Sequence, residues 1–364
     1  MEERDICTIQ GKDYFRMTLE LLAACGLAED IGDRKKKIGI KPNLVVPAPA
    51  SGGATTHPEL ADGLITYLKE NGFGDITVME SAWVGASTME AAQKNGILEV
   101  CRRHGVPFAD MKKEPGVTCR AEGLELHVCR KALEMDYLIN LPVVKGHGQT
   151  KVTCALKNYK GLIPDAEKRR FHALGLHRPI ACLNTVLRQD FILADNICGD
   201  LDFEEGGNPV AMDRILAFKD PVLCDSFAAE TMGYRPEEIE YIRLASELGV
   251  GSMDTASARI RPVRLEGENP GKAAPRGRVG RLAKYVEQRE ACSACYGSLI
   301  YALDRLDRRG LLKDRAERSI AVGQGFQGKS GALGIGNCTR CFEKNLRGCP
   351  PKAVDVVKFL EENW

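Results

Sequence analysis

Short apolar runs alternate with longer amphipathic stretches over about the first 255 residues of the chain. Strand-like runs lie at 37–41, 75–79, 137–144, 191–194 and 222–223, and helix-like stretches lie near 87–103, 180–189 and 236–248. A further helix opens at Pro58, since Thr56 can cap it and leucines recur on one of its faces. This alternation predicts an α/β fold in which a mainly parallel sheet is flanked by helices.

The composition changes between Ser257 and Arg281, where Pro, Gly and Arg replace the periodic pattern. Beyond this stretch we predict a helix near 296–309, a strand near 319–322 and a last helix that ends at Trp364. The sequence therefore predicts an α/β substrate-binding domain over 1–258, a connector over 259–284 and a small C-terminal cysteine-rich, metal-binding domain over 285–364.

Five cysteines gather in the last quarter of the chain: Cys292-Ser-Ala-Cys295 is followed by Cys338-Thr-Arg-Cys341 and then by Cys349-Pro-Pro. A CxxC pair places two sulfurs on one turn, close enough to bind one metal centre. A cysteine followed by proline is typical of ferredoxin-type ligation. Since a cluster needs four thiolates, one cysteine is spare. The pattern predicts a 4Fe–4S cluster, an iron–sulfur cofactor.

Three other interpretations compete with the cluster. Structural zinc on four thiolates suits the same CxxC pairs. Disulfides fit less well, because the other cysteines of the 14 are scattered singly through apolar segments and no signal peptide precedes them. Ordinary buried thiols are common for a single cysteine but not for a group. The small and apolar residues around the cysteines, such as Ile335 and Gly348, favour iron–sulfur and leave zinc as the alternative.

Charge and hydropathy exclude several classes of partner. The 51 basic and 50 acidic residues give a formal charge of +1, so no overall field attracts nucleic acid or a membrane surface. No apolar run approaches the roughly 18–20 residues of a transmembrane helix, and the N-terminus has no targeting character. We expect a cytoplasmic protein, and its many thiols indicate a reducing, anaerobic setting.

Polar side chains follow the strand-like runs, where ligands bind in open α/β sheets. They are Lys41, Asn43, Lys145, His147, Lys157 and Asn158. Lysines, asparagines and a histidine in one crevice suit a carboxylate or a phosphate. Thr153 and Lys157 share a face if their segment is helical, and the basic segment 168–178 is a candidate lid. The alternative is that these residues are helix caps and solvated surface lysines.

Residues 323–330 match both the Walker A pattern and GxGxxG. Both motifs require a helix directly after the loop, whereas the glycine-rich run 331–336 will not start one. The glycines are better suited to bringing backbone N–H groups near a cluster, where hydrogen bonds to sulfur tune its potential.

Over nearly its full length the chain resembles the family catalogued as domain of unknown function 362. The stretches that carry the resemblance are 41–43, 56–59, 141–147, 153–161, 220–225, 336–338 and 348–351. The resemblance implies an iron–sulfur protein of an anaerobe. It also implies that Cys338 and Cys349 are ligands beside Cys292 and Cys295, with Cys341 as the extra cysteine. A fainter, fold-level likeness runs to lactate-racemase-type proteins, although the chain lacks a nickel-cofactor signature.

The leading hypothesis is a cytoplasmic iron–sulfur oxidoreductase that passes electrons between its cluster and a small anionic substrate. In it His147 and Lys145 are catalytic, with His147 moving the proton, and a ferredoxin or a flavoprotein is the electron donor. The substrate-binding residues are Lys41, Asn43, Lys157 and Asn158. The alternatives are a non-redox isomerase or lyase with a structural or Lewis-acid cluster, and an electron-transfer or maturation protein that acts on a partner.

Overall fold

A large sheet organises the chain in the computed structural model, which describes residues 1–265, 277–313 and 315–364. Its order is β12 (Arg259–Val263), β1 (Asp5–Gln10), β11 (Pro209–Phe218), β10 (Phe191–Asp200), β7 (Tyr137–Leu141), β2 (Ile38–Pro42), β3 (Ile76–Glu80) and β4 (Phe108–Asp110). Strand β11 runs antiparallel to both of its neighbours, and the other pairs are parallel. The predicted α/β fold with a mainly parallel sheet is confirmed.

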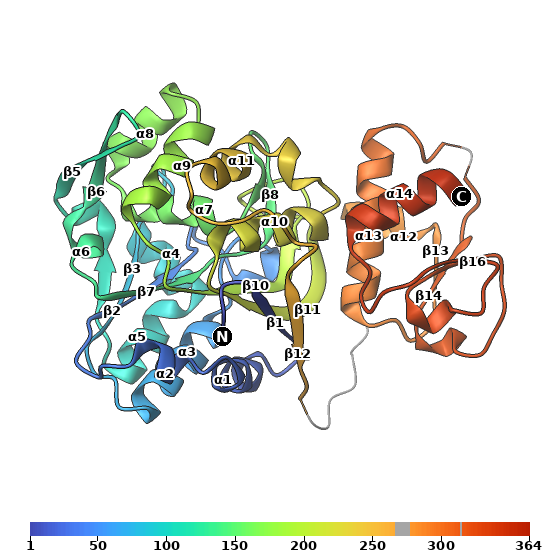
Figure 1. Ribbon diagram of the computed structural model, residues 1–364, viewed down its shortest axis with the longest axis horizontal. Helices are drawn as coiled ribbons and strands as arrows, with labels where there is room; N and C mark the ends of the chain where they lie inside the picture. The colour runs from blue at the N-terminus through green and yellow to red at the C-terminus, as the bar shows by residue number, and fades with distance from the viewer. Residues whose placement is uncertain (266–276, 314) are drawn as a thin grey trace.

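Helices cover both faces of this sheet (Figure 1). One face packs against α1 (Tyr14–Cys25), α2 (Leu27–Ile31), α3 (Pro58–Glu70), α4 (Thr88–Asn95) and α5 (Ile97–His104). The other packs against α6 (Arg130–Leu133), α7 (Ala155–Asn158), α8 (Asp165–Ala173), α9 (His177–Val186), α10 (Pro221–Thr231) and α11 (Glu240–Glu247). Because both faces are covered, the central strands β2, β3, β7 and β10 are buried along their whole length rather than at alternate residues.

The strand-like run at Val222–Leu223 was a wrong prediction, because these residues lie inside helix α10. The Asp220 side chain accepts hydrogen bonds from the backbone N–H groups of Val222 (2.8 Å) and Leu223 (2.9 Å), and Pro221 occupies the first turn. Such a cap begins a helix. Nearly every residue of α10 is buried, so its apolar run carries no helical period to distinguish it from a buried strand.

Several elements have no clear counterpart in the hydrophobic pattern. They are β1, β11 and the two hairpins β5 (Gly116–Ala121) with β6 (Leu124–Cys129) and β8 (Lys145–His147) with β9 (Lys151–Thr153). The candidate lid at 168–178 is instead mostly helical, in α8 and the start of α9. Thr153 ends β9 before α7 begins, so it does not share a helical face with Lys157.

The C-terminal region forms a second, smaller sheet, drawn in orange to red in Figure 1. Its parallel strands are β13 (Val286–Gln288), β14 (Ile320–Val322), β15 (Leu333–Ile335) and β16 (Lys344–Leu346), with helices α12 (Gly277–Ala283), α13 (Ser293–Arg308) and α14 (Ala353–Asn363). Helix α13 contacts β11, and its apolar side chains belong to the same core as one face of the large sheet.

The predicted connector 259–284 is not uniform in structure. Its first five residues form β12, which pairs in parallel with β1, residues 266–276 lie outside the described residues, and α12 follows. Short 3₁₀ turns complete the fold at 50–52, 111–113, 159–162, 236–238, 324–326 and 337–339.

The segment that matches Walker A forms the 3₁₀ turn Gln324–Phe326 and then runs into strand β15. No helix follows it, as the sequence predicted, so its loop lacks the helix N-terminus that binds phosphate in that motif.

Candidate active site and cysteine group

The polar residues predicted at strand ends gather at one edge of the large sheet. Strands β3 and β4 lie on one side of β2, and β7 and β10 lie on the other. The strand order therefore reverses between β2 and β7, and ligands of open α/β sheets bind at such a switch point, beyond the carboxyl ends of the strands. Lys41 is the penultimate residue of β2, and Lys145, His147, Lys157 and Asn158 follow β7 in the chain.

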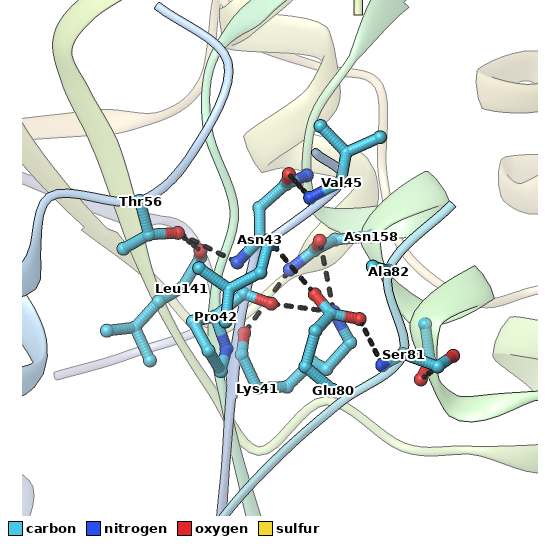
Figure 2. Close-up of polar contacts among 12 residues, drawn as sticks. Lys41, Pro42, Asn43, Val45, Thr56, Glu80, Ser81, Ala82, Leu141 and Asn158 are labelled. Atoms are coloured by element: carbon cyan, nitrogen blue, oxygen red, sulfur yellow. Dashed lines mark hydrogen bonds and ion pairs between the residues drawn. The ribbon is translucent and has the colours of Figure 1, made fainter. Parts of the chain in front are cut away.

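A buried ion pair lies at the centre of this edge (Figure 2). The Lys41 ammonium contacts the Glu80 carboxylate at 2.7 Å, and the two side chains are 1% and 4% exposed. Lys41 Nζ also donates to the Pro42 carbonyl (2.7 Å) and to Asn158 Oδ1 (3.2 Å). Burial lowers the pKa of Lys41, and the charge of Glu80 opposes that shift. The Lys41 ammonium therefore donates its hydrogen bonds to protein oxygens and has none left for a ligand.

Gly161 is required beside this pair because a larger residue does not fit. A Cβ at that position would overlap Glu80 Oε1 and Lys41 Cε. The Glu80 carboxylate in turn accepts backbone N–H groups from Leu44 (3.0 Å) and Ser81 (2.7 Å). The ion pair thus fixes the loops that leave β2 and β3.

Lys145 is also fully buried and bound to protein acceptors. Its ammonium donates to the carbonyls of Ala54 (2.5 Å) and Glu204 (2.8 Å) and to Asn43 Oδ1 (3.3 Å). Burial lowers the pKa of Lys145 to about 7. Lys145, which lies in β8, therefore links that strand to the loop after β2 and to the β10–β11 loop.

Glu204, which the sequence analysis missed, contacts two of the predicted residues. Its carboxylate lies 2.5 Å from Lys157 Nζ and 3.2 Å from His147 Nε2. His147 Nδ1 accepts the backbone N–H groups of Gln149 and Thr150, each at 3.1 Å. The ring proton is consequently on Nε2 and points to Glu204, a neutral state that agrees with burial lowering the pKa of His147.

Burial opposes the ionisation of Glu204, but the charge of Lys157 and the hydrogen bond from His147 keep its pKa well below the ordinary value. Glu204 is thus a carboxylate held by two donors. It lies in the glycine-rich loop between β10 and β11, and no spacing in the sequence links it to residues near 147. Only the acidic pair Glu204-Glu205 marks the place.

A cavity of about 100 Å³ opens beside these groups. Its lining includes Asn43, Glu80, Trp83, Thr153, Lys157, Asn158, Lys160, Lys168, His172 and Glu204. Within the described part of the chain, Lys160 has no carboxylate at ion-pair distance, and its Nζ lies 3.3 Å from His172 Nε2. Burial lowers the pKa of Lys160 to about 7. Among the described lysines that line this cavity, Lys160 is therefore the one that forms no ion pair with a carboxylate.

The Thr153 hydroxyl favours a polar ligand in this cavity. Thr153 Oγ1 is buried and has no hydrogen-bond partner among the described residues, yet Thr153 lines the cavity. Buried polar atoms are seldom left unpaired. By contrast, Lys168 Nζ already donates to the carbonyls of Ser81 (2.9 Å) and Ala82 (2.7 Å).

Four of the five C-terminal cysteines, which we term the cysteine group, converge from separate segments: Cys292, Cys295, Cys338 and Cys349. Cys292 precedes the first residue of α13 and Cys295 lies in its first turn. Contact with Cys292, burial and the charges of Cys349 and Cys338 raise the pKa of Cys295. Burial and the charges of Cys292 and Cys338 raise the pKa of Cys349.

Cys341 does not contribute to these pKa shifts, and like Cys349 it is exposed. Gln327 Nε2 lies 3.6 Å from Cys338 Sγ, and a Cβ at Gly336 would lie 3.8 Å from Cys295 Sγ. The backbone at Gly336 (φ +92°) therefore passes close to the group in a conformation that favours glycine.

A second set of candidate metal ligands is buried in the α/β core. Cys154, Cys224 and Asp225 offer ligand atoms within 4.8 Å of one another, and the two sulfurs lie 3.6 Å apart. The carboxylate of Asp225 already accepts the Tyr241 hydroxyl at 2.8 Å. The chain thus offers groups of side chains that can bind a metal, and the geometry does not name the metal.

Comparison with known proteins identifies the family. The model for Domain of unknown function (DUF362) matches residues 38–230, more than half of the chain. The chain belongs to the DUF362 family. The match includes all the residues of the strand-end site and ends before the cysteine group.

Two individual proteins are more distantly similar to this chain. Thylakoid-associated protein sll1697 of Synechocystis sp. is 28% identical over 157 residues, which are 43% of this chain and 47% of that protein. The chain thus aligns with about half the length of this relative. The lactate racemase apoprotein of Thermoanaerobacterium thermosaccharolyticum covers 53% of this chain and 51% of its own, with 16% identity and a TM-score of 0.35. That similarity says nothing about function.

None of the helices in the described residues has the length and apolar character needed to cross a membrane.

The buried ion pair generates a stability prediction. Lys41→Met should lower the free energy of unfolding by about 3–5 kcal/mol, because it leaves the Glu80 carboxylate buried without its counter-charge. The double variant Lys41→Met/Glu80→Leu should recover much of that loss. Urea-induced unfolding of the three proteins measures both effects.

The exposed pair Lys94–Glu90, at 2.8 Å, provides the control. Lys94→Met should change the unfolding free energy by less than about 1 kcal/mol. Equal effects of the two lysine variants would show that the Lys41 pair is not the buried constraint described above.

Proposed function

We propose that this DUF362 protein is an iron–sulfur oxidoreductase that exchanges electrons between one 4Fe–4S cluster and a small anion bound at the strand-end cavity. The observation that carries the proposal is the convergence of Cys292, Cys295, Cys338 and Cys349, with Cys341 left outside. Four thiols from three separate segments match the ligand number of a cubane cluster.

The residues around the sulfurs favour iron–sulfur over zinc, because Cys349 is followed by proline, as is typical of ferredoxin-type ligation, and small or apolar residues surround the group. The four thiolates would bind the cluster, and the cluster would supply single electrons.

The cavity supports a small anionic substrate. Lys160, together with His172, would bind the negative group, and the free hydroxyl of Thr153 would donate to it. Asn43 and Asn158 line the same space. A volume of about 100 Å³ restricts the buried part of the ligand to a few atoms. Trp83, 53% exposed, also lines this cavity and offers an apolar surface to the rest of the ligand.

Glu204 is the carboxylate of the cavity that can accept a hydrogen bond from the substrate. It lines the cavity, and Lys157 and His147 fix both of its oxygens. Because these contacts hold its pKa well below the ordinary value, Glu204 is an acceptor rather than a strong base. In this proposal His147 orients Glu204, and Lys145 fixes the loop that carries it. Lys41 and Asn158 fix the edge of the sheet.

The same cavity supports the alternative of a non-redox isomerase or lyase. Lys160, with a pKa of about 7, is partly unprotonated near neutral pH and can then remove a proton from a bound acid without any electron donor. In that case the cluster, or zinc, would serve structure or act as a Lewis acid. Turnover without an added reductant distinguishes this alternative from the oxidoreductase.

A ferredoxin or a flavoprotein is the proposed electron donor, and a reducing cytoplasm is the proposed location. All 14 cysteines are free thiols, as a reducing compartment requires. The exposed basic residues Arg340 and Arg347 flank Cys338 and Cys349 in the chain, and neither has a carboxylate partner in the described residues. Such a surface favours an acidic carrier protein.

The first prediction of this proposal concerns metal content. Protein prepared under anaerobic conditions should contain about four iron and four acid-labile sulfide per chain, because a single cubane has that composition. Elemental analysis and visible absorbance measure it. Stoichiometric zinc without sulfide would contradict the oxidoreductase.

The second prediction concerns the ligands. Replacement of Cys292, Cys295, Cys338 or Cys349 by Ser should remove or degrade the cluster, since each variant loses one thiolate. Cys341→Ser is the matched control within the same CxxC and should retain full iron and sulfide. Loss of the cluster in Cys341→Ser, with retention in Cys338→Ser, would reverse the assignment.

The third prediction concerns the pH dependence of anion binding. Lys160, with a pKa near 7, is charged below that pH and loses its charge above it. Sulfate, which does not titrate in this range, should therefore bind about tenfold more weakly at pH 8 than at pH 6. Calorimetric titration measures this.

Lys160→Met should bind sulfate weakly at both pH values. Lys151→Met, at an exposed lysine outside the cavity, should bind like the parent. A parent-like pH profile in Lys160→Met would place the anion elsewhere.

A further inference from the structure

The cysteine group lies against the large sheet rather than within the small one alone. The Ser293 hydroxyl, next to Cys292, donates to the Asp213 carboxylate. A Cβ at Gly297 would overlap the sulfur of Met212. The first turns of α13, which carry Cys292 and Cys295, therefore pack on the segment of β11 that precedes Arg214.

Arg214 is a buried cation with no anionic partner in the described residues. It is 6% exposed, and its guanidinium donates to Asn196 Oδ1 (3.0 Å) and to Thr231 Oγ1 (3.3 Å), both neutral groups. Burial lowers the pKa of Arg214 to about 10, and the charges that oppose this shift are those of Cys295, Tyr301 and Cys292. A buried charge normally requires a counter-charge.

Gln10 lies directly across the β1–β11 ladder from Arg214, so the two side chains emerge on the same face of the sheet. Gln10 Nε2 is buried and has no hydrogen-bond partner in the described residues. Contact with Cys295 and, to a smaller extent, with Gln10 lowers the pKa of Cys292 to about 6. The adjacent Asn196, which binds Arg214, also has an unpaired amide nitrogen.

The large sheet thus presents a row of N–H donors from β1 and β11 beside the cysteine group, and one member of the row is charged. A zinc or iron centre on four thiolates is anionic, and the potential of an iron–sulfur cluster depends on its net charge, on hydrogen bonds to its sulfurs and on burial. The row supplies the charge and the hydrogen bonds.

We propose that Arg214 is the counter-charge of the 4Fe–4S cluster and that Gln10 donates a hydrogen bond to it, so that two residues of the α/β part set the potential of a cofactor bound by the C-terminal cysteines. This inference rests on the proposed function. Both are positioning residues. Since reduction adds negative charge to the cluster, a buried cation beside it favours the reduced state and raises the potential.

The test is an anaerobic redox titration of the full chain, followed by visible absorbance and electron paramagnetic resonance. Arg214→Met should lower the midpoint potential, so that the ratio of reduced to oxidised cluster at a fixed potential falls at least tenfold, or about 59 mV for one electron. Gln10→Leu should shift it in the same direction by less. Arg214→Lys should restore most of the parent value.

Arg305→Met is the matched control. Arg305 is a buried arginine of α13, the helix that carries Cys295. It is 5% exposed and contacts Asp304 and the Tyr234 ring. It lies ten residues beyond Cys295, about 15 Å along α13. Its replacement should leave the potential unchanged.

A potential in Arg214→Met equal to that of the control would overturn the inference while leaving the cluster proposal intact. If Arg214→Met fails to retain a cluster, Gln10→Leu and the neutral variant Arg214→Gln decide, and parent potentials in both overturn the inference. Zinc without sulfide in the parent protein overturns the proposed function and this inference together, and elemental analysis before the titration identifies that case.

Discussion

The buried Lys41–Glu80 pair is the interaction on which the rest of the site depends. It lies at the point where the strand order reverses, and its two residues lie at the carboxyl ends of the neighbouring strands β2 and β3. A charge at this depth is stable only when its partner and its remaining hydrogen bonds are in place. The loops that carry Asn43 and Ser81, and the close approach of Gly161, are therefore fixed by one ion pair. The cavity forms around that fixed edge.

The same edge of the sheet brings the cavity and the cysteine group toward one another. Strand β1 runs parallel to β2, β7 and β10, so Gln10 lies at the same end of the sheet as Lys41. The β10–β11 loop extends between the two regions: Glu204 contacts Lys157 and His147, and Asp202 contacts Arg278 of α12 at 2.6 Å. A change in either region would thus alter the contacts of the loop that carries Glu204.

Sequence reasoning succeeded where one residue type has one dominant use. Lysine and asparagine at the ends of apolar runs lie at the carboxyl edge of the sheet, and the ligand role of the clustered cysteines stays a prediction. It was wrong at Val222–Leu223, because a fully buried helix has no polar face and its capping residue, Asp220, had to be recognised instead. It missed Glu204, since the loop that brings this residue to His147 lies about 57 positions away in the chain.

The sequence by itself determined the α/β class, the family resemblance and the set of cysteines, because periodicity, strand-end residues and CxxC spacing are local properties of the chain. Only the tertiary structure decided which charges are free to meet a ligand. Lys41 is paired with a carboxylate and Lys145 donates to three protein oxygens, whereas Lys160 and Arg214 have no carboxylate partner in the described residues. That difference depends on which distant acceptors surround each ammonium or guanidinium group, and burial then makes the presence or absence of a partner energetically decisive.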